Sequence, residues 1–301
     1  MNASKLITGA ITDEFSPDLR VAAAAMAESN LTGAELRMVG SRNVVELSIR
    51  EVREVKQLLS GHGIEVAVIA APLLKCKCPG TEKMEEGVIG DIFGSDYSFA
   101  EQKDLAERSF EVANEAGARI VRAFSFWKVP NPASVFEVIA VQLRALAELA
   151  ERSGLIIGLE NETACNVATS SDAAKMVSAV DHPNLQVVWD PANSYASGQR
   201  AFPEGYESIP FSKLAHVHVK DCRVINGSVT WSCLGDGEVE WKQILDALVR
   251  QGFAGRVHLE THWPGATGDK LEASRVCAGI LQDLVRSAEA AVLKKSGSHA
   301  H

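Results

Sequence analysis

The chain has 301 residues, 46% of them hydrophobic, and a formal net charge of −9 at pH 7. This composition suits a folded protein with a large apolar core, and its acidic balance does not favour binding to the phosphate backbone of a nucleic acid. No stretch approaches the roughly 20 apolar residues of a membrane helix, and the N-terminus lacks the apolar core of a signal peptide, so we expect a cytoplasmic protein without membrane contact.

Short apolar segments alternate with longer amphipathic segments along the chain. In chain order the expected strands are Leu6–Thr12, Gly33–Arg37, Ile64–Ala70, Arg119–Phe124, Leu155–Glu160, Leu185–Asp190, Ala215–Lys220 and Arg256–Thr261. The expected helices are Asp18–Ser29, Ser48–His62, Ser98–Ala116, Pro132–Ser153, Ser171–Val180, Trp241–Gln251 and Lys270–Val292. The sixth connection, Phe202–Lys213, has room for only a short helix.

This alternation predicts an α/β fold with a parallel sheet, and eight strands favour closure into a (β/α)8 TIM barrel. The alternative is a doubly wound open sheet, which usually carries a glycine-rich phosphate turn after its first strand. The segment 12–17 at that place, Thr-Asp-Glu-Phe-Ser-Pro, has no glycine. We therefore expect a single barrel domain over residues 1–292 and a disordered tail over 293–301.

Two connections are longer than a strand-to-helix link requires, Pro72–Tyr97 and Asp221–Gly237. Both follow the carboxyl end of a strand, where this architecture builds its active sites. They are candidate lids, although a partly helical structural insertion is an equal alternative. The first contains the glycines Gly80, Gly87, Gly90 and Gly94, which would give a lid backbone freedom.

Four expected strands in the second half of the chain end in side chains typical of metal ligands. Period-2 alternation places these side chains inside the barrel, because the apolar residues between them face the helices. They are Glu160, Asp190, His218 and Glu260. A buried cluster of three carboxylates is costly unless a cation compensates it. With one imidazole, this donor set favours one divalent metal ion, Mn²⁺ first, with Mg²⁺, Co²⁺ or Zn²⁺ as alternatives.

Taken singly, each of these residues has a simpler interpretation. A glutamate at a strand end usually caps the next turn, and an inward histidine is usually part of the core. Four such residues at successive strand ends favour the metal site. His216 and His258 lie one inward position deeper, and we expect them to be structural or to orient the ligands.

The sequence around these positions resembles the xylose isomerase-like TIM barrel superfamily and, within it, the sugar phosphate isomerase/epimerase family. The resemblance rests on Leu159–Thr163, Trp189–Asn193, His216–Asp221, Leu234–Trp241 and His258–His262. It implies Glu160, Asp190, His218 and Glu260 as metal ligands. In the ketose 3-epimerase branch the two ligand glutamates also form the acid/base pair, which implies catalytic roles for Glu160 and Glu260.

The sequence departs from its relatives at particular positions. The substrate-binding glutamate of the ketose 3-epimerases falls on Asn166, their histidine after the aspartate ligand falls on Asn193, and their arginine has only Arg223 nearby, one position out of register. The related endonucleases for abasic DNA need further metal-binding histidines. Asn193 replaces one of these, and Ala70-Ala71-Pro72 stands where another would be.

These observations predict an isomerase or epimerase that acts on a sugar or keto-sugar through α-proton abstraction and an enediolate. The runner-up is a metal-dependent lyase or dehydratase acting on a keto-glycoside, inosose or dehydroshikimate-like substrate. An abasic-site endonuclease and a non-catalytic sugar-binding subunit are weaker alternatives. The expected partner is a small sugar-like molecule, and self-association into a homo-oligomer stays open.

Six residues are candidates for binding the substrate: Lys220, His262, Asn193, Arg223, Trp127 and Arg37. The polar ones could bind hydroxyl, carboxylate or phosphate groups, and Trp127 could stack on a sugar ring. A salt bridge within the barrel rim, or a packing role for Trp127, is an equal alternative. Arg122, Glu14 and Glu35 near other strand ends carry the same ambiguity.

Overall fold

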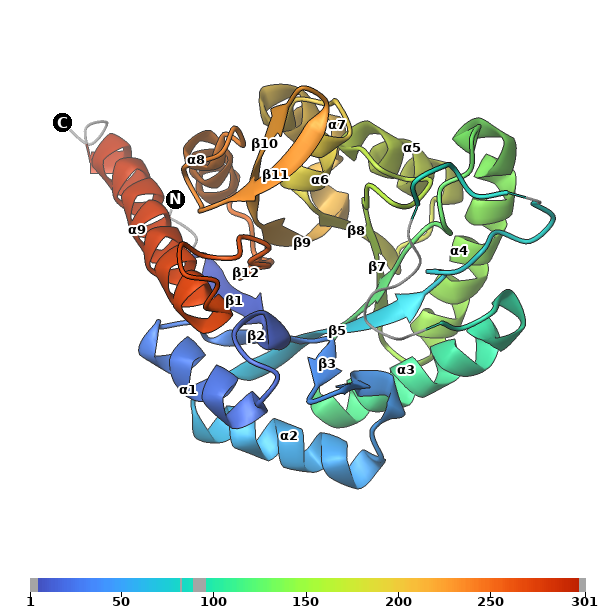
Figure 1. The fold of residues 1–301 in the computed structure, drawn as a ribbon, viewed down its shortest axis with the longest axis horizontal. Helices are drawn as coiled ribbons and strands as arrows, with labels where there is room; N and C mark the ends of the chain where they lie inside the picture. Colours follow the sequence, from blue (N-terminus) through green and yellow to red (C-terminus); the bar gives the residue numbers. More distant parts are fainter. Residues whose placement is uncertain (1–4, 82, 89–95, 298–301) are drawn as a thin grey trace.

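The computed structural model describes residues 5–81, 83–88 and 96–297, with side chains described up to residue 293. Eight parallel strands form a closed barrel in the order β1-β12-β9-β8-β7-β6-β5-β2, and the helices surround them (Figure 1). The strands are β1 Ile7–Ile11, β2 Gly33–Leu36, β5 Glu65–Leu73, β6 Ile120–Ala123, β7 Ile156–Glu160, β8 Leu185–Trp189, β9 Leu214–Val219 and β12 Arg256–Leu259. The predicted single-domain TIM barrel is confirmed.

Capping residues in the local sequence begin or end several of the helices. They are α1 Leu19–Glu28, α2 Ile49–Gly61, α3 Gln102–Ala116, α4 Phe136–Arg152, α5 Ser170–Val180, α6 Pro191–Ala196, α7 Tyr206–Ser208, α8 Trp241–Gln251 and α9 Lys270–Gly297. Ser48 begins α2 through a capping box with Glu51, and Thr169 begins α5 in the same way. Gly117 ends α3 at φ 84°, a left-handed conformation that glycine adopts without strain.

Strand alternation separates the apolar core from the barrel interior. In β9, Val217 and Val219 belong to the apolar core, while His216 and His218 alternate with them and meet charged side chains inside the barrel. The register places His258 of β12 beside both His218 and Gly9 of β1. A Cβ atom at Gly9 or Gly33 would overlap the imidazole of His258, so these glycines make room for a buried histidine.

The two long connections follow β5 and β9. Strand β5 continues to Leu73, three residues past its expected end, and much of the segment after it is irregular. Gly80 and Gly87 have positive φ values, whereas Gly90 and Gly94 lie outside the described residues. The second connection forms an antiparallel hairpin, β10 Asp221–Ile225 with β11 Ser228–Ser232, that the sequence patterns did not predict. A smaller hairpin, β3 Met38–Val39 with β4 Arg42–Asn43, follows β2.

The last helix differs from its expected boundary. It continues to Gly297, five residues beyond Val292, so regular structure extends past the expected start of a tail at residue 293. Residues 298–301 of that expected tail lie outside the described part. Among the helices of the described residues, none is long and apolar enough to cross a membrane.

Candidate active site

Four ionisable side chains meet where β7, β8, β9 and β12 end. Glu160 is the last residue of β7, Asp190 follows β8, His218 lies near the end of β9 and Glu260 follows β12. Each offers a potential ligand atom within 4.8 Å of the other three, and all four side chains are buried. The structure thus brings together the four residues that the sequence suggested as metal ligands, and we call them the carboxylate cluster.

Hydrogen bonds between strand ends hold Asp190 in this cluster. The Asn161 side chain accepts the backbone N–H of Asp190 and donates to its carbonyl, both at 2.8 Å. Oδ1 of Asp190 accepts the backbone N–H of Asn193 at 2.8 Å, which caps α6. The Asn193 side chain donates in turn to the Asn161 carbonyl at 2.9 Å. Oδ2 of Asp190 is therefore the oxygen available to the cluster.

Cationic side chains surround the carboxylates. Nζ of Lys220 lies 2.7 Å from Oε2 of Glu260 and 2.8 Å from Oδ2 of Asp190. A guanidinium nitrogen of Arg122 lies 3.1 Å from Oε2 of Glu160. Because such buried charges are costly without partners, these pairs offset part of the cluster's negative charge.

Burial and these ion pairs determine the protonation of the cluster. Burial raises the pKa of Asp190 to about 6, although the Lys220 ammonium opposes this effect. Burial also acts to raise the pKa of Glu260, but Lys220 and His262 outweigh it and hold that pKa well below its usual range. The pKa of Glu160 is lowered because His218 and Arg122 outweigh burial. At neutral pH the three carboxylates are therefore mainly ionised.

The chemistry of the cluster fits a divalent metal ion. Oε2 of Glu160 and Oδ2 of Asp190 accept no hydrogen bond from the described residues, although each lies beside a cation. Nδ1 of His218 lies 3.1 Å from Oε1 of Glu160 and 3.7 Å from Oε2 of Glu260, so this ring nitrogen faces the carboxylates. Three carboxylates and one imidazole are donors that Mn²⁺, Mg²⁺ and Co²⁺ accept, and Zn²⁺ also accepts them.

A protein-family model described as a xylose isomerase-like TIM barrel matches residues 23–277. The chain belongs to this family. No curated protein matches the chain in sequence. A fusion protein of a xylose isomerase-like TIM barrel with 4-hydroxyphenylpyruvate dioxygenase aligns at 20% identity and a TM-score of 0.67. That alignment covers 91% of this chain but only 42% of the fusion protein.

Solved structures with similar barrels include a zinc-bound protein, a sugar epimerase and a probable dehydratase. The IolI protein with a bound zinc atom aligns at a TM-score of 0.72 and 18% identity, over 94% of this chain and 99% of its own. D-psicose 3-epimerase from Clostridium cellulolyticum H10, solved with D-tagatose, gives 0.65 and 17%, over 95% and 97%. The probable 3-DHS dehydratase AsbF from Bacillus anthracis gives 0.67 and 15%, over 89% and 97%. At these identities the likeness shows a shared fold.

In this xylose isomerase-like barrel, three of the suggested substrate-binding residues lie at the carboxylate cluster. Lys220 joins Asp190 and Glu260 as described above. Nε2 of His262 lies 3.4 Å from Oε1 of Glu260. Arg37 is buried, lies 3.3 Å from the same oxygen and also pairs with Asp13 at 2.7 Å.

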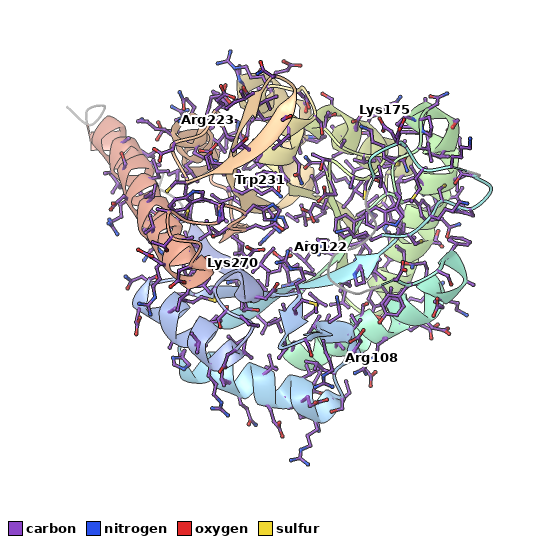
Figure 2. All side chains as sticks on the ribbon, in the orientation of Figure 1. Arg108, Arg122, Lys175, Arg223, Trp231 and Lys270 are labelled. Atoms are coloured by element: carbon purple, nitrogen blue, oxygen red, sulfur yellow. The ribbon has the colours of Figure 1, made fainter. Side chains whose placement is uncertain are left out.

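The other three suggested substrate-binding residues are engaged in structural contacts. The amide and backbone of Asn193 are used by the hydrogen bonds that hold Asp190. Arg223 projects from the hairpin, nearer the outside of the barrel than Trp231 (Figure 2), and its Nε donates to the Asp236 carbonyl at 2.7 Å. Trp127 is buried in a small apolar group with Phe124 and Cys165, so packing accounts for its position.

Trp231 on β11 is a residue that the sequence patterns did not single out. Its ring meets the His262 ring edge-on at 4.8 Å between centroids, and Nζ of Lys220 lies 5.2 Å from its centre. The hairpin that carries it turns at Asn226-Gly227, and both residues have positive φ values, 51° and 79°. An Asn-Gly pair between alternating apolar residues is a strong hairpin signal, so this dipeptide could have revealed the element.

Asp221 anchors the base of that hairpin. Its carboxylate accepts backbone N–H groups from residues that follow along the loop: Cys222 at 2.9 Å, Gly235 at 2.9 Å, Gly237 at 3.2 Å and Val239 at 3.2 Å. A Cβ atom at Gly237 would overlap this carboxylate. Beside it, the Trp241 indole donates to the Lys220 carbonyl at 3.0 Å. The hairpin and Lys220 are therefore fixed together.

A cavity of about 830 Å³ opens at the amino ends of the strands, opposite the carboxylate cluster. It is lined by residues that begin strands, including Ile7, Ile120, Ile156 and Arg256. Enzymes with this architecture have their active sites at the carboxyl ends of the strands. This cavity therefore lies at the end of the barrel opposite to the one where the architecture has its active sites.

Proposed function

We propose that the protein is a divalent-metal-dependent isomerase or epimerase that acts on a sugar or keto-sugar by removing a proton next to a carbonyl group. The observation that carries this proposal is the meeting of Glu160, Asp190, His218 and Glu260 at the carboxyl ends of the strands. Enzymes with this architecture have their active sites at that end. We favour Mn²⁺, with Mg²⁺, Co²⁺ and Zn²⁺ as alternatives, and the zinc atom in the IolI structure supports the last.

The four side chains would hold the ion, which would polarise a substrate carbonyl and so acidify the neighbouring C–H bond. Glu260 is the base we favour because its low pKa keeps it ionised at neutral pH. The same low pKa makes it a weak base while Lys220 is paired with it. Substrate oxygens that draw Lys220 away from Glu260 would raise its basicity at the moment when it is needed.

Glu160 is the partner that would return the proton. Strands β7 and β12 are three steps apart in the barrel order, so the carboxylates of Glu160 and Glu260 approach a central substrate from different sides. Return of the proton on the opposite face of the same carbon inverts a stereocentre. Return at the neighbouring carbon gives an isomer.

Lys220, His262 and Trp231 would form one wall of the substrate site. Lys220 and the imidazole of His262 can bind hydroxyl oxygens, and the Trp231 ring can pack against the carbon face of a sugar. This proposal is supported by the contacts of Trp231 with both Lys220 and His262, which themselves lie beside Glu260. This arrangement supports a small, hydroxylated substrate.

A dehydratase or lyase is the second candidate function. Its support is the similar barrel of the probable 3-DHS dehydratase AsbF. The first step would be the same proton removal by Glu260, followed by loss of a hydroxyl group or an aglycone from the next carbon. A keto-glycoside, an inosose or a dehydroshikimate-like compound would suit this chemistry.

The test is incubation of the Mn²⁺-loaded protein in D2O with a panel of ketoses, 3-keto-glycosides and inososes, followed by NMR. We expect loss of one α-proton signal from at least one compound, and no loss with protein kept in a chelator. Exchange with an isomeric product supports the first proposal, and release of water or an aglycone supports the second. Metal-loaded protein that exchanges no proton in any compound contradicts both and indicates a non-catalytic sugar-binding subunit.

A further inference from the structure

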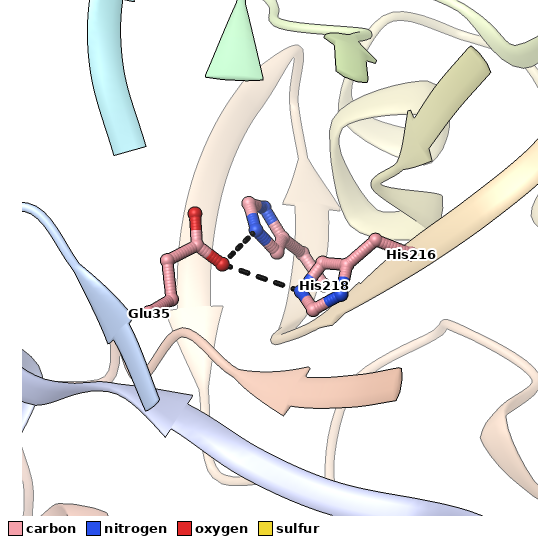
Figure 3. Close-up of side chains that lie close together, drawn as sticks. All are labelled: Glu35, His216 and His218. Carbon is pink, nitrogen blue, oxygen red and sulfur yellow. Dashed lines mark hydrogen bonds and ion pairs between the residues drawn. The ribbon is translucent and has the colours of Figure 1, made fainter. Parts of the chain in front are cut away.

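A further acidic residue, outside the carboxylate cluster, lies inside the barrel in contact with His218. Glu35 of β2 is fully buried, and its Oε2 lies 3.0 Å from Nε2 of His218 and 3.2 Å from Nε2 of His216 (Figure 3). Strand β2 is separated from β9 by β1 and β12 in the barrel order, so this contact crosses the interior. The role of Glu35 is not explained by strand packing.

The two nitrogens of the His218 ring face different partners. Nδ1 faces Glu160 and Glu260, whereas Nε2 faces Glu35. An imidazole that binds a metal through Nδ1 must carry its proton on Nε2. A carboxylate placed at Nε2 accepts that proton in a hydrogen bond, which selects this tautomer, fixes the ring plane and increases the electron density on the ligand nitrogen.

The surroundings hold Glu35 in this position. His216 contacts the same oxygen, and its ring packs edge-on against His258 at 4.3 Å between centroids. The His258 ring occupies the space left by the glycines of β1 and β2. On the other side, a guanidinium nitrogen of Arg122 lies 3.9 Å from Oε1 of Glu35. Burying a carboxylate costs desolvation free energy. This layer of polar contacts therefore indicates that Glu35 has a role beyond filling the core.

We propose that Glu35 is a positioning residue of the metal centre, which accepts a hydrogen bond from Nε2–H of His218 and thereby turns Nδ1 toward the ion. This inference rests on the metal site of the proposed function. An alternative use of the same side chains is a second ion held by Glu35, His216 and His218, whose potential ligand atoms also lie within 4.8 Å of one another. That use would require His218 to give both ring nitrogens to metals, whereas a single protonated Nε2 satisfies Glu35 directly.

The test compares wild-type protein with Glu35→Leu and Glu35→Gln, each freed of metal and titrated with Co²⁺ by visible absorption and with Mn²⁺ or Zn²⁺ against a competing chelator. We expect Glu35→Leu to weaken binding by about 10- to 100-fold and to change the Co²⁺ spectrum. Glu35→Gln should restore part of the affinity, because an amide oxygen accepts the same hydrogen bond without the charge. Gln102→Leu is the control, since it removes another buried polar side chain, whose hydrogen bonds go to the backbone of Leu74 and Ser98 and not to the cluster.

Four outcomes separate the claims. Weaker binding and an altered spectrum in the Glu35 variants, with wild-type behaviour in the control, support the inference. Wild-type affinity and spectrum in both Glu35 variants overturn it and leave the metal site intact. Two ions in wild-type protein and one in Glu35→Leu overturn it in favour of a second site. Failure of wild-type protein to bind any of these ions removes the proposed function, and this inference with it. If Glu35→Leu does not fold, the Glu35→Gln titration decides between the first two.

Discussion

The Glu260 carboxylate lies beside three side chains that can carry a positive charge. Lys220 contacts one carboxylate oxygen, and Arg37 and His262 contact the other. These partners follow the ends of β2, β9 and β12, so residues distant in sequence influence the charge state of one carboxylate. Since Lys220 also reaches Asp190, its movement would change both residues together. We therefore propose that Lys220 links substrate binding to the basicity of Glu260.

The first prediction concerns Glu260→Gln. The amide keeps the size of the side chain and one oxygen for a metal, but it cannot accept a proton. We expect this variant to retain a divalent ion and to lose α-proton exchange by about 100-fold or more. Metal content and NMR exchange rates in D2O measure the two effects separately. Normal exchange in Glu260→Gln, combined with its loss in Lys220→Ala or His262→Ala, would place the base on the barrel rim and contradict the two-glutamate mechanism.

The sequence predicted that some site residues cluster but failed to predict the positions of others. The difference has a physical reason. Glu160, Asp190, His218 and Glu260 sit at the ends of regular strands, where period-2 alternation and a common strand direction determine where a side chain points. Arg223 lies on the hairpin β10–β11, outside the barrel sheet, and Trp127 lies in the segment after β6, so the position of each depends on contacts distant in sequence. The contact of Glu35 with His218 crosses the barrel and depends on how the sheet closes, which no local pattern contains.

The hairpin β10–β11 is the element that shapes the rim above Glu260. It follows β9 directly, and its base is fixed by the carboxylate of Asp221, which takes the backbone N–H groups of a returning loop. Burial raises the pKa of Asp221, although these N–H groups oppose the effect. The glycine at position 237 is required because the loop passes so close to that carboxylate. The motif at residues 234–241 thus supplies the backbone N–H groups that the Asp221 carboxylate accepts.

The second prediction concerns Asp221→Ala. This change leaves several backbone N–H groups without their acceptor, and we expect the free energy of unfolding to fall by roughly 3 kcal/mol. The hairpin should also become more accessible to protease between residues 222 and 232. Urea denaturation and limited proteolysis measure these effects. Asp236→Ala is a matched control because Asp236 is an exposed acid of the same loop, and equal behaviour of the two variants would contradict the anchoring role.

The elements of the barrel were predicted more completely than its insertions. The eight expected strands are present, and their bounds differ from the expected ones by a few residues, because their apolar, β-branched composition agrees with burial between the barrel interior and the helices. The hairpin was missed because its apolar residues alternate with polar ones and do not form the continuous apolar run of a barrel strand, and because the Asn226-Gly227 turn was not used as a signal. Helix α9 continues past Val292 because the residues after it contain no proline or early glycine to end it.

In the whole barrel, unfavourable electrostatic repulsion is concentrated at one end. Three carboxylates that repel one another are buried at the carboxyl ends of its strands, while the apolar core lies around the outside of the sheet. A bound cation would relieve that repulsion only in the folded state, because the ligands come from residues 160–260 and meet only when the barrel closes. Binding of such an ion would therefore raise the stability of the whole folded chain.

The third prediction follows from this linkage and from the pKa of about 6 for Asp190. A metal ion needs the ionised carboxylate, so stabilisation by Mn²⁺ should be present above pH 6 and should decline as the pH falls through 6. At 100 times the dissociation constant, the ion should add about 2.7 kcal/mol to the free energy of unfolding at pH 7. Without metal the sign for Asp190 is opposite: its raised pKa means that it contributes less stability as pH rises from about 4 to 6.

Thermal unfolding with Mn²⁺ and with chelator, at about pH 5 and pH 7, measures both effects together. His218→Ala is the control, because loss of one ligand should make the unfolding temperature insensitive to metal while the barrel still folds. An Mn²⁺-dependent rise that is equal at both pH values would show that Asp190 is not a ligand whose proton competes with the ion. An equal rise in His218→Ala would show that the ion binds outside the carboxylate cluster. Because the ion acts only on the folded chain, the size of the wild-type rise reports how much of the buried repulsion it removes.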